Sequence, residues 1–170
     1  MARILTRGIG SHHGLFPNWT DDWQTPPHIL EALGEFDMDP CASANQVHRT
    51  ARAMLTKDEH GSGLLCRWIG RVWCNPPYGR TVGEWLDRLA AHGNGIALIF
   101  ARTDTEWFQA VCFGKADGIL FLAGRVAFIK PDGKVASHNS GGPSCLVAYG
   151  QYNASVLANC KLPGMYVGLK

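Results

Sequence analysis

The stretch that decides the fold is residues 71–86, RVWCNPPYGRTVGEWL. Its first part, 71–75, is an apolar run that suits a buried strand. The turn that follows is stiffened by two prolines, each of which fixes φ and lacks a backbone donor. Thr81-Val82-Gly83-Glu84 then has the pattern of a capping box, which predicts a helix that ends before Gly93. A strand that leads through a short turn into a helix is the repeating unit of an α/β sheet.

The same alternation continues on both sides of this stretch. Apolar runs predict strands at residues 36–39, 71–75, 96–100, 118–122, 125–129 and 144–149. Capping patterns predict a helix from Pro26 to Leu33 capped by Thr25, a helix from the capping box 103–106 to Gly114, and a weaker helix at 44–55 capped by Ser43. The sequence therefore predicts a single α/β domain with a mostly parallel sheet and an antiparallel strand at its end.

The composition agrees with one globular domain. The chain has 170 residues, of which 46% are hydrophobic and 18% are charged. No apolar run approaches the roughly 20 residues that span a bilayer, and the first residues lack a secretory apolar region, so we expect a cytoplasmic protein without a membrane partner. Residues 1–70 hold 6 Lys/Arg and 8 Asp/Glu, whereas residues 71–170 hold 10 and 6. This balance neither requires nor excludes a polyanion partner, but it makes the second half the place to look for one.

The cysteines and histidines do not form a metal-binding pattern. The chain has 6 cysteines and 7 histidines, but no C-x-x-C pair and no close His spacing. Several cysteines lie in apolar runs, where a reduced core thiol is common. We expect reduced thiols and no metal.

The tetrapeptide Asn75-Pro76-Pro77-Tyr78 carries the chemistry. It follows a strand, and ligands of open α/β sheets bind at the carboxyl ends of the strands. Carbonyl oxygens in the stiff turn and the side chain of Asn75 can accept hydrogen bonds from a planar amine, while Tyr78 offers a flat face for stacking. A base in that position would have to leave its duplex. The alternative is an ordinary tight turn at the end of a strand.

The chain resembles the small phage and prophage DNA N6-adenine methyltransferases, the phage Dam-type family. Asn75-Pro76-Pro77-Tyr78 is similar to the catalytic motif of S-adenosylmethionine-dependent amino-methyltransferases, in the Asn form typical of DNA adenine-N6 enzymes. The matching stretches are WQTP (23–26), FDMDPCAS (36–43), VWCNPPYGR (72–80), ARTDTEWF (101–108), GRVAF (124–128) and PS (143–144). Together they cover roughly residues 21–149.

The resemblance implies a Rossmann-like class I methyltransferase fold. Residues 21–150 would form the core, 1–20 a flexible N-terminal arm, 130–143 a mobile loop that faces DNA, and 151–170 a C-terminal extension. The glycine-rich cofactor loop usual in the wider superfamily is missing after Asp39. The segment between Asp39 and Asn75 is also short, so the second or third strand of the fold is expected to be shortened or lost.

The resemblance also implies an activity, namely transfer of a methyl group from S-adenosylmethionine to the N6 amine of a flipped adenine in DNA. Asn75 and the Pro76 carbonyl would accept hydrogen bonds from that amine, Pro77 would stiffen the turn, and Tyr78 would stack on the base. The expected cofactor-binding residues are Trp23, Thr25, Pro26, Asp39, Pro40, Cys41, Ala42, Asp58 (toward the ribose) and Asn75. The expected DNA-binding residues are Arg80, Arg102, Asp104, Arg125, Phe128, Lys130 and Lys134.

Other activities stay open at this point. Pro40-Cys41 is similar to the Pro-Cys nucleophile of cytosine-C5 methyltransferases, although the accompanying Glu-Asn-Val motif is missing and the tetrapeptide would have no role. Cytosine-N4 methylation and a catalytically inactive DNA-binding relative are further alternatives. The chain leaves little sequence for a recognition domain, so we expect relaxed specificity, with a homodimer as a source of a second reading surface. Protection of phage DNA from restriction is an expectation from the resemblance alone.

Overall fold

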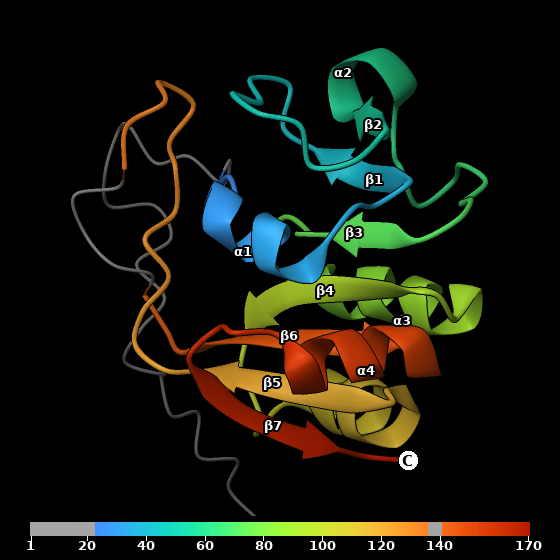
Figure 1. Ribbon diagram of the computed structural model, residues 1–170. Coiled ribbons are helices and arrows are strands. Elements are labelled where there is room, and N and C mark those ends of the chain that lie inside the picture. Colours follow the sequence, from blue (N-terminus) through green and yellow to red (C-terminus); the bar gives the residue numbers. More distant parts are fainter. Residues whose placement is uncertain (1–22, 136–140) are drawn as a thin grey trace, which may run out of the picture.

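The computed structural model describes residues 23–135 and 141–170, which form one α/β unit around a single sheet (Figure 1). The described strands are β1 (Met38–Ala42), β2 (Ala53–Thr56), β3 (Val72–Cys74), β4 (Gly95–Phe100), β5 (Gly118–Leu122), β6 (Ser144–Tyr149) and β7 (Gly164–Gly168). They lie in the order β2-β1-β3-β4-β6-β5-β7. Strands β1 to β5 run in one direction, whereas β6 and β7 run against their neighbours.

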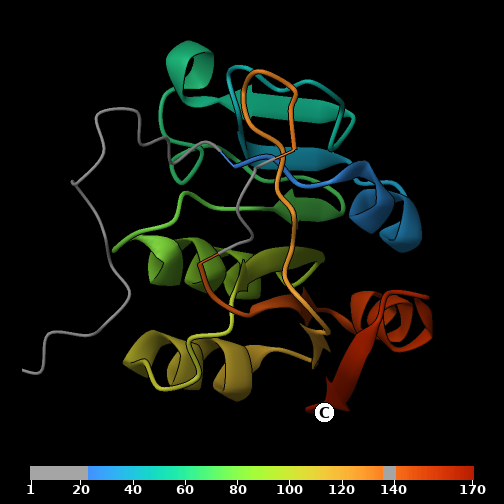
Figure 2. The ribbon, with the colours of Figure 1, turned by 90° about the vertical axis from the view of Figure 1, so that its left-hand side faces the viewer.

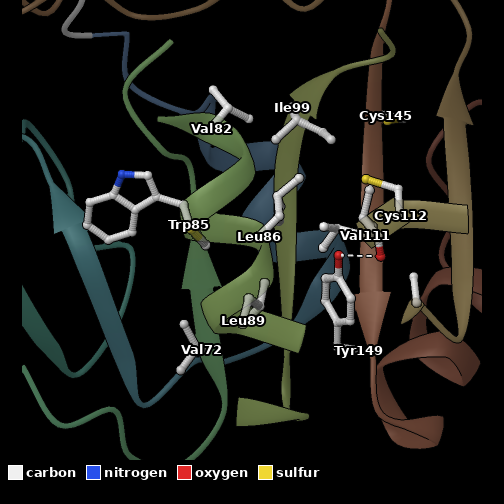
Figure 3. Close-up of a cluster of buried hydrophobic side chains, with 14 of the residues drawn as sticks. Val72, Val82, Trp85, Leu86, Leu89, Ile99, Val111, Cys112, Cys145 and Tyr149 are labelled. Carbon is white, nitrogen blue, oxygen red and sulfur yellow. Dashed lines mark hydrogen bonds between the residues drawn. The ribbon is translucent and has the colours of Figure 1, made fainter. Parts of the chain in front are cut away.

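Helices cover both faces of the sheet (Figures 1 and 2). The first helix, α1 (Pro27–Leu33), and the last, α4 (Gln151–Asn159), pack on one face, where Leu33, Trp73 and Leu157 belong to one buried cluster. The other face carries α3 (Val82–His92) and the π-helical turn η1 (Phe108–Phe113). Figure 3 shows the cluster on this second face, in which the Tyr149 hydroxyl donates to the Val111 carbonyl over 3.2 Å. Both faces of the central strands are therefore buried, as their continuous apolar runs require.

The central predictions of secondary structure are confirmed. Strands lie at the predicted positions 96–100, 118–122 and 144–149, and β3 lies within 71–75. Strand 144–149 is antiparallel as expected, but it lies inside the sheet, and β7 forms an additional antiparallel edge. The helix after Thr81 ends at Gly93, whose φ of 74° is the left-handed conformation that glycine adopts readily.

The capping predictions are wrong in detail. The Thr81 side chain makes no cap; its carbonyl instead accepts from the backbone amides of Glu84 and Trp85. The cap of α1 is Pro26, so Thr25 lies outside the helix and is buried. In the segment predicted from the box at 103–106, the hydroxyl of Thr105 accepts from the Phe108 amide over 3.4 Å. The amides at the starts of these helices therefore donate to the Thr81 carbonyl and the Thr105 hydroxyl, and not to the side chains of Thr81 and Thr103 that the capping boxes predict.

The expected helix at 44–55 is wrong. Residues 43–52 form a loop, and 53–56 form β2, which pairs with β1 in parallel. The buried side chain of Gln24 fixes this loop in a non-helical conformation. Its amide nitrogen donates to the Asn45 carbonyl over 2.7 Å, and its amide oxygen accepts from the Val47 amide over 3.0 Å. Long-range hydrogen bonds thus replace the helical ones.

Two strand predictions also need correction. The first strand is Met38–Ala42, not 36–39, and the register shift between Asp39 and Ala42 accommodates Pro40, which has no backbone donor. Residues 125–129 form no strand; only Ile129 makes isolated bridges, to Gln24 and Val135.

The remaining segments differ from or refine the expectations. Only β2 and the single turn α2 (Lys57–His60) lie between β1 and β3, as the expected shortening of that region implies. Residues 151–170, expected as an extension, contribute α4 and β7 to the fold. The expected arm 1–20 and the middle of loop 130–143 lie outside the described residues. No helix within the described ranges is long and apolar enough to cross a bilayer.

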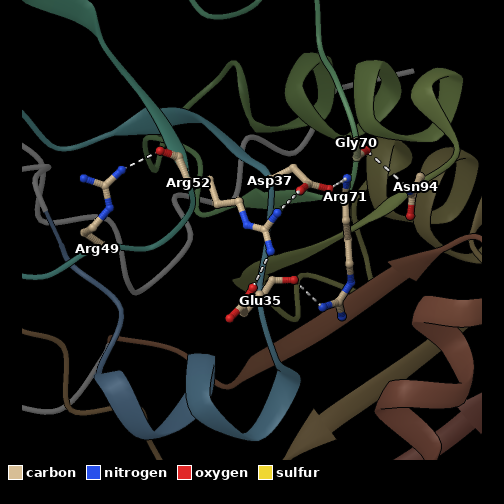
Figure 4. Close-up of polar contacts among 7 residues, drawn as sticks. All are labelled: Glu35, Asp37, Arg49, Arg52, Gly70, Arg71 and Asn94. Carbon is tan, nitrogen blue, oxygen red and sulfur yellow. Dashed lines mark hydrogen bonds and ion pairs between the residues drawn. The ribbon is translucent and has the colours of Figure 1, made fainter.

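A buried arginine, Arg71, ties the two helices of one face to the sheet. Figure 4 shows its contacts with Asp37 and Glu35. The Arg71 guanidinium donates to the carbonyls of Leu33 and Glu35 and, over 2.7 Å, to the side chain of Asn153 on α4. It also lies 4.2 Å from the centroid of the Phe36 ring. Residue 71 precedes β3, so this network lies at the opposite edge of the sheet from the Asn75 turn, and we assign it a structural role.

Candidate active site at the carboxyl edge of the sheet

The carboxyl ends of β1, β3 and β4 meet at one edge of the sheet, because these strands are parallel neighbours. A cavity of about 680 Å³ lies there. Its walls come from the segment before α1, the end of β1 and the loop after it, the loop after α2, and the turn after β3. The lining residues include Trp23, Thr25, Asp39, Pro40, Cys41, Ala42, Gln46, Thr50, Lys57, Trp73, Asn75, Pro76, Pro77, Tyr78 and Trp85.

Asn75 is fixed at the mouth of β3. Its amide nitrogen donates to the Trp23 carbonyl over 2.6 Å, and its amide oxygen lies 3.4 Å from the Tyr78 hydroxyl. The nitrogen is used by Trp23, and the oxygen accepts from the Tyr78 hydroxyl, which leaves its second lone pair for a ligand. Asn75, Pro76 and Pro77 all line the larger cavity.

Tyr78 sits in an aromatic cluster. Its ring stacks on Phe100 with a centroid distance of 4.4 Å and an interplanar angle of 29°, and it meets Phe128 edge-on at 5.9 Å. Burial raises the pKa of the Tyr78 hydroxyl far above its ordinary value, so the phenol is neutral at any physiological pH. The ring is held as an uncharged aromatic plate beside the Asn75 amide.

Asp39 supplies a buried carboxyl group to the same cavity. It accepts hydrogen bonds from the Cys41 amide over 3.0 Å and from the Thr50 hydroxyl. Burial nevertheless raises the pKa of Asp39 from 3.8 to about 6, because desolvation outweighs these hydrogen bonds. A cationic or hydroxyl-bearing ligand next to Asp39 would recover part of that desolvation cost.

Three buried donors around the cavity have no hydrogen-bond partner within the described parts of the chain. They are the Thr25 hydroxyl, the Gln46 amide nitrogen and the Trp73 indole nitrogen. An unsatisfied buried donor costs on the order of 1–3 kcal/mol, so such groups usually serve a ligand or ordered water. All three residues line the larger cavity, so a ligand there could supply the missing acceptor atoms.

Cys41 has no features of a nucleophile. Its sulfur lies 3.8 Å from the sulfur of Cys74, and burial raises the pKa of the Cys41 thiol well above its ordinary value. A catalytic cysteine needs a lowered pKa. This geometry argues against the cytosine-C5 alternative. All six cysteines of the chain are free thiols.

A second cavity, of about 300 Å³, adjoins the first at Tyr78. Arg80 lines it from the turn after β3, and Arg102 and Trp107 line it from the segment after β4. Phe100, at the end of β4, forms another part of its wall. Of all the residues named above, only Tyr78 belongs to both cavities.

The segment 123–135, which we call the crossing segment, runs from the end of β5 across this edge of the sheet (Figures 1 and 2). Gln24 and Ile129 exchange both backbone hydrogen bonds at 2.9 Å, which fixes the crossing segment to the residues before α1. Phe128 is 3% exposed and packs against Trp23 and Tyr78. The crossing segment thus helps to hold the aromatic cluster in place.

The comparison with known families places the chain as a whole in a family. The family model for DNA N-6-adenine-methyltransferase (Dam) matches residues 15–160. The chain belongs to this family. No curated protein and no solved structure matches the sequence. Dam-family membership implies N6-adenine methylation of DNA, with DNA as the partner.

Most of the expected residues of this Dam-family chain are brought together. Asn75–Tyr78, Trp23, Thr25 and 39–42 all line the larger cavity. Two expected cofactor-binding residues do not line it: Pro26 is buried at the start of α1, and Asp58 is exposed on α2. Within the described residues, no group of His, Cys, Asp and Glu side chains could hold a metal ion.

The expected DNA-binding residues fall into three groups. Arg80 and Arg102 line the second cavity. Arg125, Phe128, Lys130 and Lys134 belong to the crossing segment, with Phe128 buried and Arg125 and Lys134 exposed. Asp104 is exposed and lines neither cavity.

Sequence reasoning missed several lining residues of the Dam-family site. Gln46, Lys57 and Trp73 line the larger cavity, and Trp107 lines the smaller one. Gln46 lies in the loop 43–52 and Lys57 begins the single turn α2, and neither belongs to a spacing pattern. Trp73, by contrast, lies in β3, and Trp107 follows β4; both strands end at the site, and this position was an available signal.

Proposed function

We propose that this chain transfers the methyl group of S-adenosylmethionine to the N6 amine of an adenine flipped out of DNA. The observation that carries the proposal is the fixed Asn75 amide, which lines the larger cavity and whose nitrogen donates to the Trp23 carbonyl while its oxygen accepts from the Tyr78 hydroxyl. Parallel strands β1 to β4, with helices on both faces, support the Rossmann-like class I fold that this activity requires.

The larger cavity fits the chemistry of this cofactor. S-adenosylmethionine carries an ammonium, a carboxylate, ribose hydroxyls and a purine, and its sulfonium supplies the methyl group. Asp39 would hold a cationic or hydroxyl group of the cofactor, since it is an acceptor at the end of β1. The unpartnered donors of Thr25, Gln46 and Trp73 would bind acceptor atoms of the cofactor.

The chain's own residues act on the target amine. Asn75 Oδ1 and the Pro76 carbonyl accept its two N–H groups, which turns the nitrogen lone pair toward the electrophile. As the nitrogen gains positive charge, these two oxygens stabilise it without reorganising, because the prolines and the Trp23 carbonyl already fix them. The neutral Tyr78 ring stacks on the base and restricts its orientation.

Base flipping and relaxed specificity are parts of the same proposal. A base within a duplex cannot reach acceptors in a cavity at the edge of a sheet, so it must rotate out of the helix. Residues 151–170 are used by α4 and β7, so the described surfaces left for DNA are the smaller cavity and the crossing segment. Such a surface supports a short target sequence. A role in protecting phage DNA from restriction is an extension of this proposal that rests on the resemblance.

The test of the proposal is the variant Asn75→Ala. Titration calorimetry with S-adenosylmethionine should give a dissociation constant within about threefold of the wild type, whereas transfer of a radiolabelled methyl group to DNA should fall by at least about a thousandfold. Asn94→Ala, at the opposite edge of the sheet, is the matched control and should keep transfer. Wild-type transfer by Asn75→Ala would overturn the mechanism. Cofactor binding without any transfer by the wild type would favour the inactive relative.

A further inference from the structure

The smaller cavity, which we call the arginine–tryptophan cavity, is formed by two turns that follow neighbouring strands. Arg80 comes from the turn between β3 and α3, and Arg102 and Trp107 come from the segment between β4 and η1. Its volume is about 300 Å³. It lies next to the proposed methyl-transfer site, with Tyr78 as the shared wall.

The two arginines of this cavity are available for a ligand. Both are exposed, and neither guanidinium forms an ion pair or a hydrogen bond with the residues that the structure describes. Planar guanidinium groups match the geometry of phosphate oxygens, which they can bind through two parallel hydrogen bonds. Two free guanidiniums on one small cavity therefore indicate a ligand with phosphate groups.

Trp107 gives the cavity a fixed aromatic wall. It is half-buried, and its ring lies 5.6 Å from that of Phe108. Gly83, in the first turn of α3, is what lets Trp107 lie so close to that helix, because a Cβ at position 83 would be 2.9 Å from the Cβ of Trp107. An indole held in this way is suited to stacking with a nucleobase, an interaction that tolerates any base identity.

The arginine–tryptophan cavity is not the place of the methylated base. Asn75 and Pro76, whose oxygens would accept the target amine, line the larger cavity but not this one. A base bound against Trp107 therefore lies on the Arg80–Arg102 side of Tyr78, away from these acceptors. It must be a neighbour of the target base in the DNA strand.

We propose that the arginine–tryptophan cavity binds the nucleotide adjacent to the target adenine, with the base stacked on Trp107 and the flanking phosphates paired with Arg80 and Arg102. This inference rests on the proposed function and adds a subsite to it. The subsite holds the strand beside the flipped base and places the target adenine at Asn75.

The test of the stacking contact is a double-mutant cycle between the protein and the DNA. The probe is a labelled duplex with one strand that contains a single adenine within G and C, and its variants carry an abasic site on either side of that adenine. Fluorescence anisotropy measures the binding of wild-type protein, Trp107→Ala and Trp107→Phe in the presence of S-adenosylmethionine. Trp107→Ala should weaken binding of the intact duplex by about tenfold, and Trp107→Phe should retain most of the affinity.

The coupling between protein and DNA separates stacking from a merely structural role. When the abasic site is at the neighbour that stacks on Trp107, Trp107→Ala should cause no further loss, because the contact is already absent. A loss of equal size for the intact duplex and for both abasic duplexes would overturn the stacking proposal.

The salt dependence of DNA binding tests the phosphate contacts separately. Arg80→Gln and Arg102→Gln should each reduce the slope of log Kd against log salt concentration by about 0.9, as expected for one lost phosphate contact. Arg67→Gln is the matched control, because Arg67 is also exposed but lines neither cavity. Unchanged slopes for Arg80→Gln and Arg102→Gln would overturn the phosphate assignment.

These readouts are independent of methyl transfer. If the wild type bound DNA with the expected coupling but transferred no methyl group, the proposed function would fail while the subsite would stand. If the wild type methylated DNA and Trp107→Ala showed no coupling, the subsite would fail while the proposed function would stand.

Discussion

Single residues at the carboxyl edge carry unfavourable free energy that a ligand would relieve. The carboxyl group of Asp39 is desolvated, and the hydroxyl of Thr25 is buried without a partner in the described chain. Residues that are strained or unsatisfied in a folded protein tend to lie at functional sites. Variants of these two residues therefore test the proposed cavity ligand, through the stability of the free protein and its affinity for the cofactor.

The raised pKa of Asp39 predicts a pH dependence of stability. The folded state binds the proton more tightly than the unfolded chain, so the group stabilises the fold fully below pH 3.8, and this stabilisation is lost as the pH rises through about 6. The wild type should lose up to about 3 kcal/mol relative to Asp39→Asn between pH 4 and pH 7. Urea unfolding of both proteins measures this. Glu31→Gln, at an exposed position, is the control. Parallel pH profiles of the wild type and Asp39→Asn would contradict the prediction.

Thr25→Val should shift stability and affinity in opposite directions. Replacing the unpartnered hydroxyl with a methyl group of similar shape removes a buried polar group, so the free protein should gain about 1 kcal/mol in the free energy of unfolding. The affinity for S-adenosylmethionine should fall by about five- to tenfold, because one cofactor hydrogen bond is lost. Thermal unfolding and titration calorimetry provide the two values.

Thr50→Val is the contrast to this variant, since the Thr50 hydroxyl already donates to Asp39. It should destabilise the free protein. If Thr25→Val were less stable than the wild type and bound the cofactor equally well, the Thr25 hydroxyl would have no role in the cavity.

At the scale of elements, the site is assembled by segments that lie far apart in the sequence. The turn after β3 supplies Asn75, the residues before α1 hold its amide through the Trp23 carbonyl, and the crossing segment packs Phe128 against both. The backbone pair of Gln24 and Ile129 links the last two segments. A change in the crossing segment should therefore reach the catalytic turn.

Phe128→Leu tests this link. Replacing this buried Phe with Leu, which is smaller and not aromatic, should lower the free energy of unfolding by about 1–1.5 kcal/mol. Methyl transfer should fall by about tenfold in kcat, because Tyr78 loses its edge-on contact and its orientation broadens. Cofactor affinity should change little. Leu157→Val, on the face covered by α4, should cost similar stability without a loss in kcat. Equal kcat values for Phe128→Leu and the wild type would show that the crossing segment does not position Tyr78.

At the scale of the whole molecule, the sequence predicts the sheet better than it predicts its connections. Runs such as 96–100 and 144–149 are buried on both faces, and this leaves a continuous apolar signal. The helix prediction for the loop at 43–52 failed because the structure of this loop depends on Gln24, a residue distant in the sequence. The motif Asn75–Tyr78 predicts the proposed catalytic turn from the sequence alone, whereas residues such as Gln46 and Trp73 can be assigned to the cavity only from the fold.

The fold shows where some of the excess basic residues of the second half lie. The second half holds 10 Lys/Arg against 6 Asp/Glu. Arg80 and Arg102 from this half line the smaller cavity, and Arg125 and Lys134 lie on the crossing segment. These basic residues thus lie at the same edge of the sheet as the Asn75 turn, where we propose that DNA binds.

The central claim is that the Asn75 turn directs a methyl group to adenine N6. The most direct measurement is to treat plasmid DNA with S-adenosylmethionine and either the wild type or Asn75→Ala, then to identify and map every methylated base. We expect N6-methyladenine at many sites of short sequence context with the wild type, and none above background with Asn75→Ala. Methylcytosine as the product, or equal N6-methyladenine from both proteins, would contradict it.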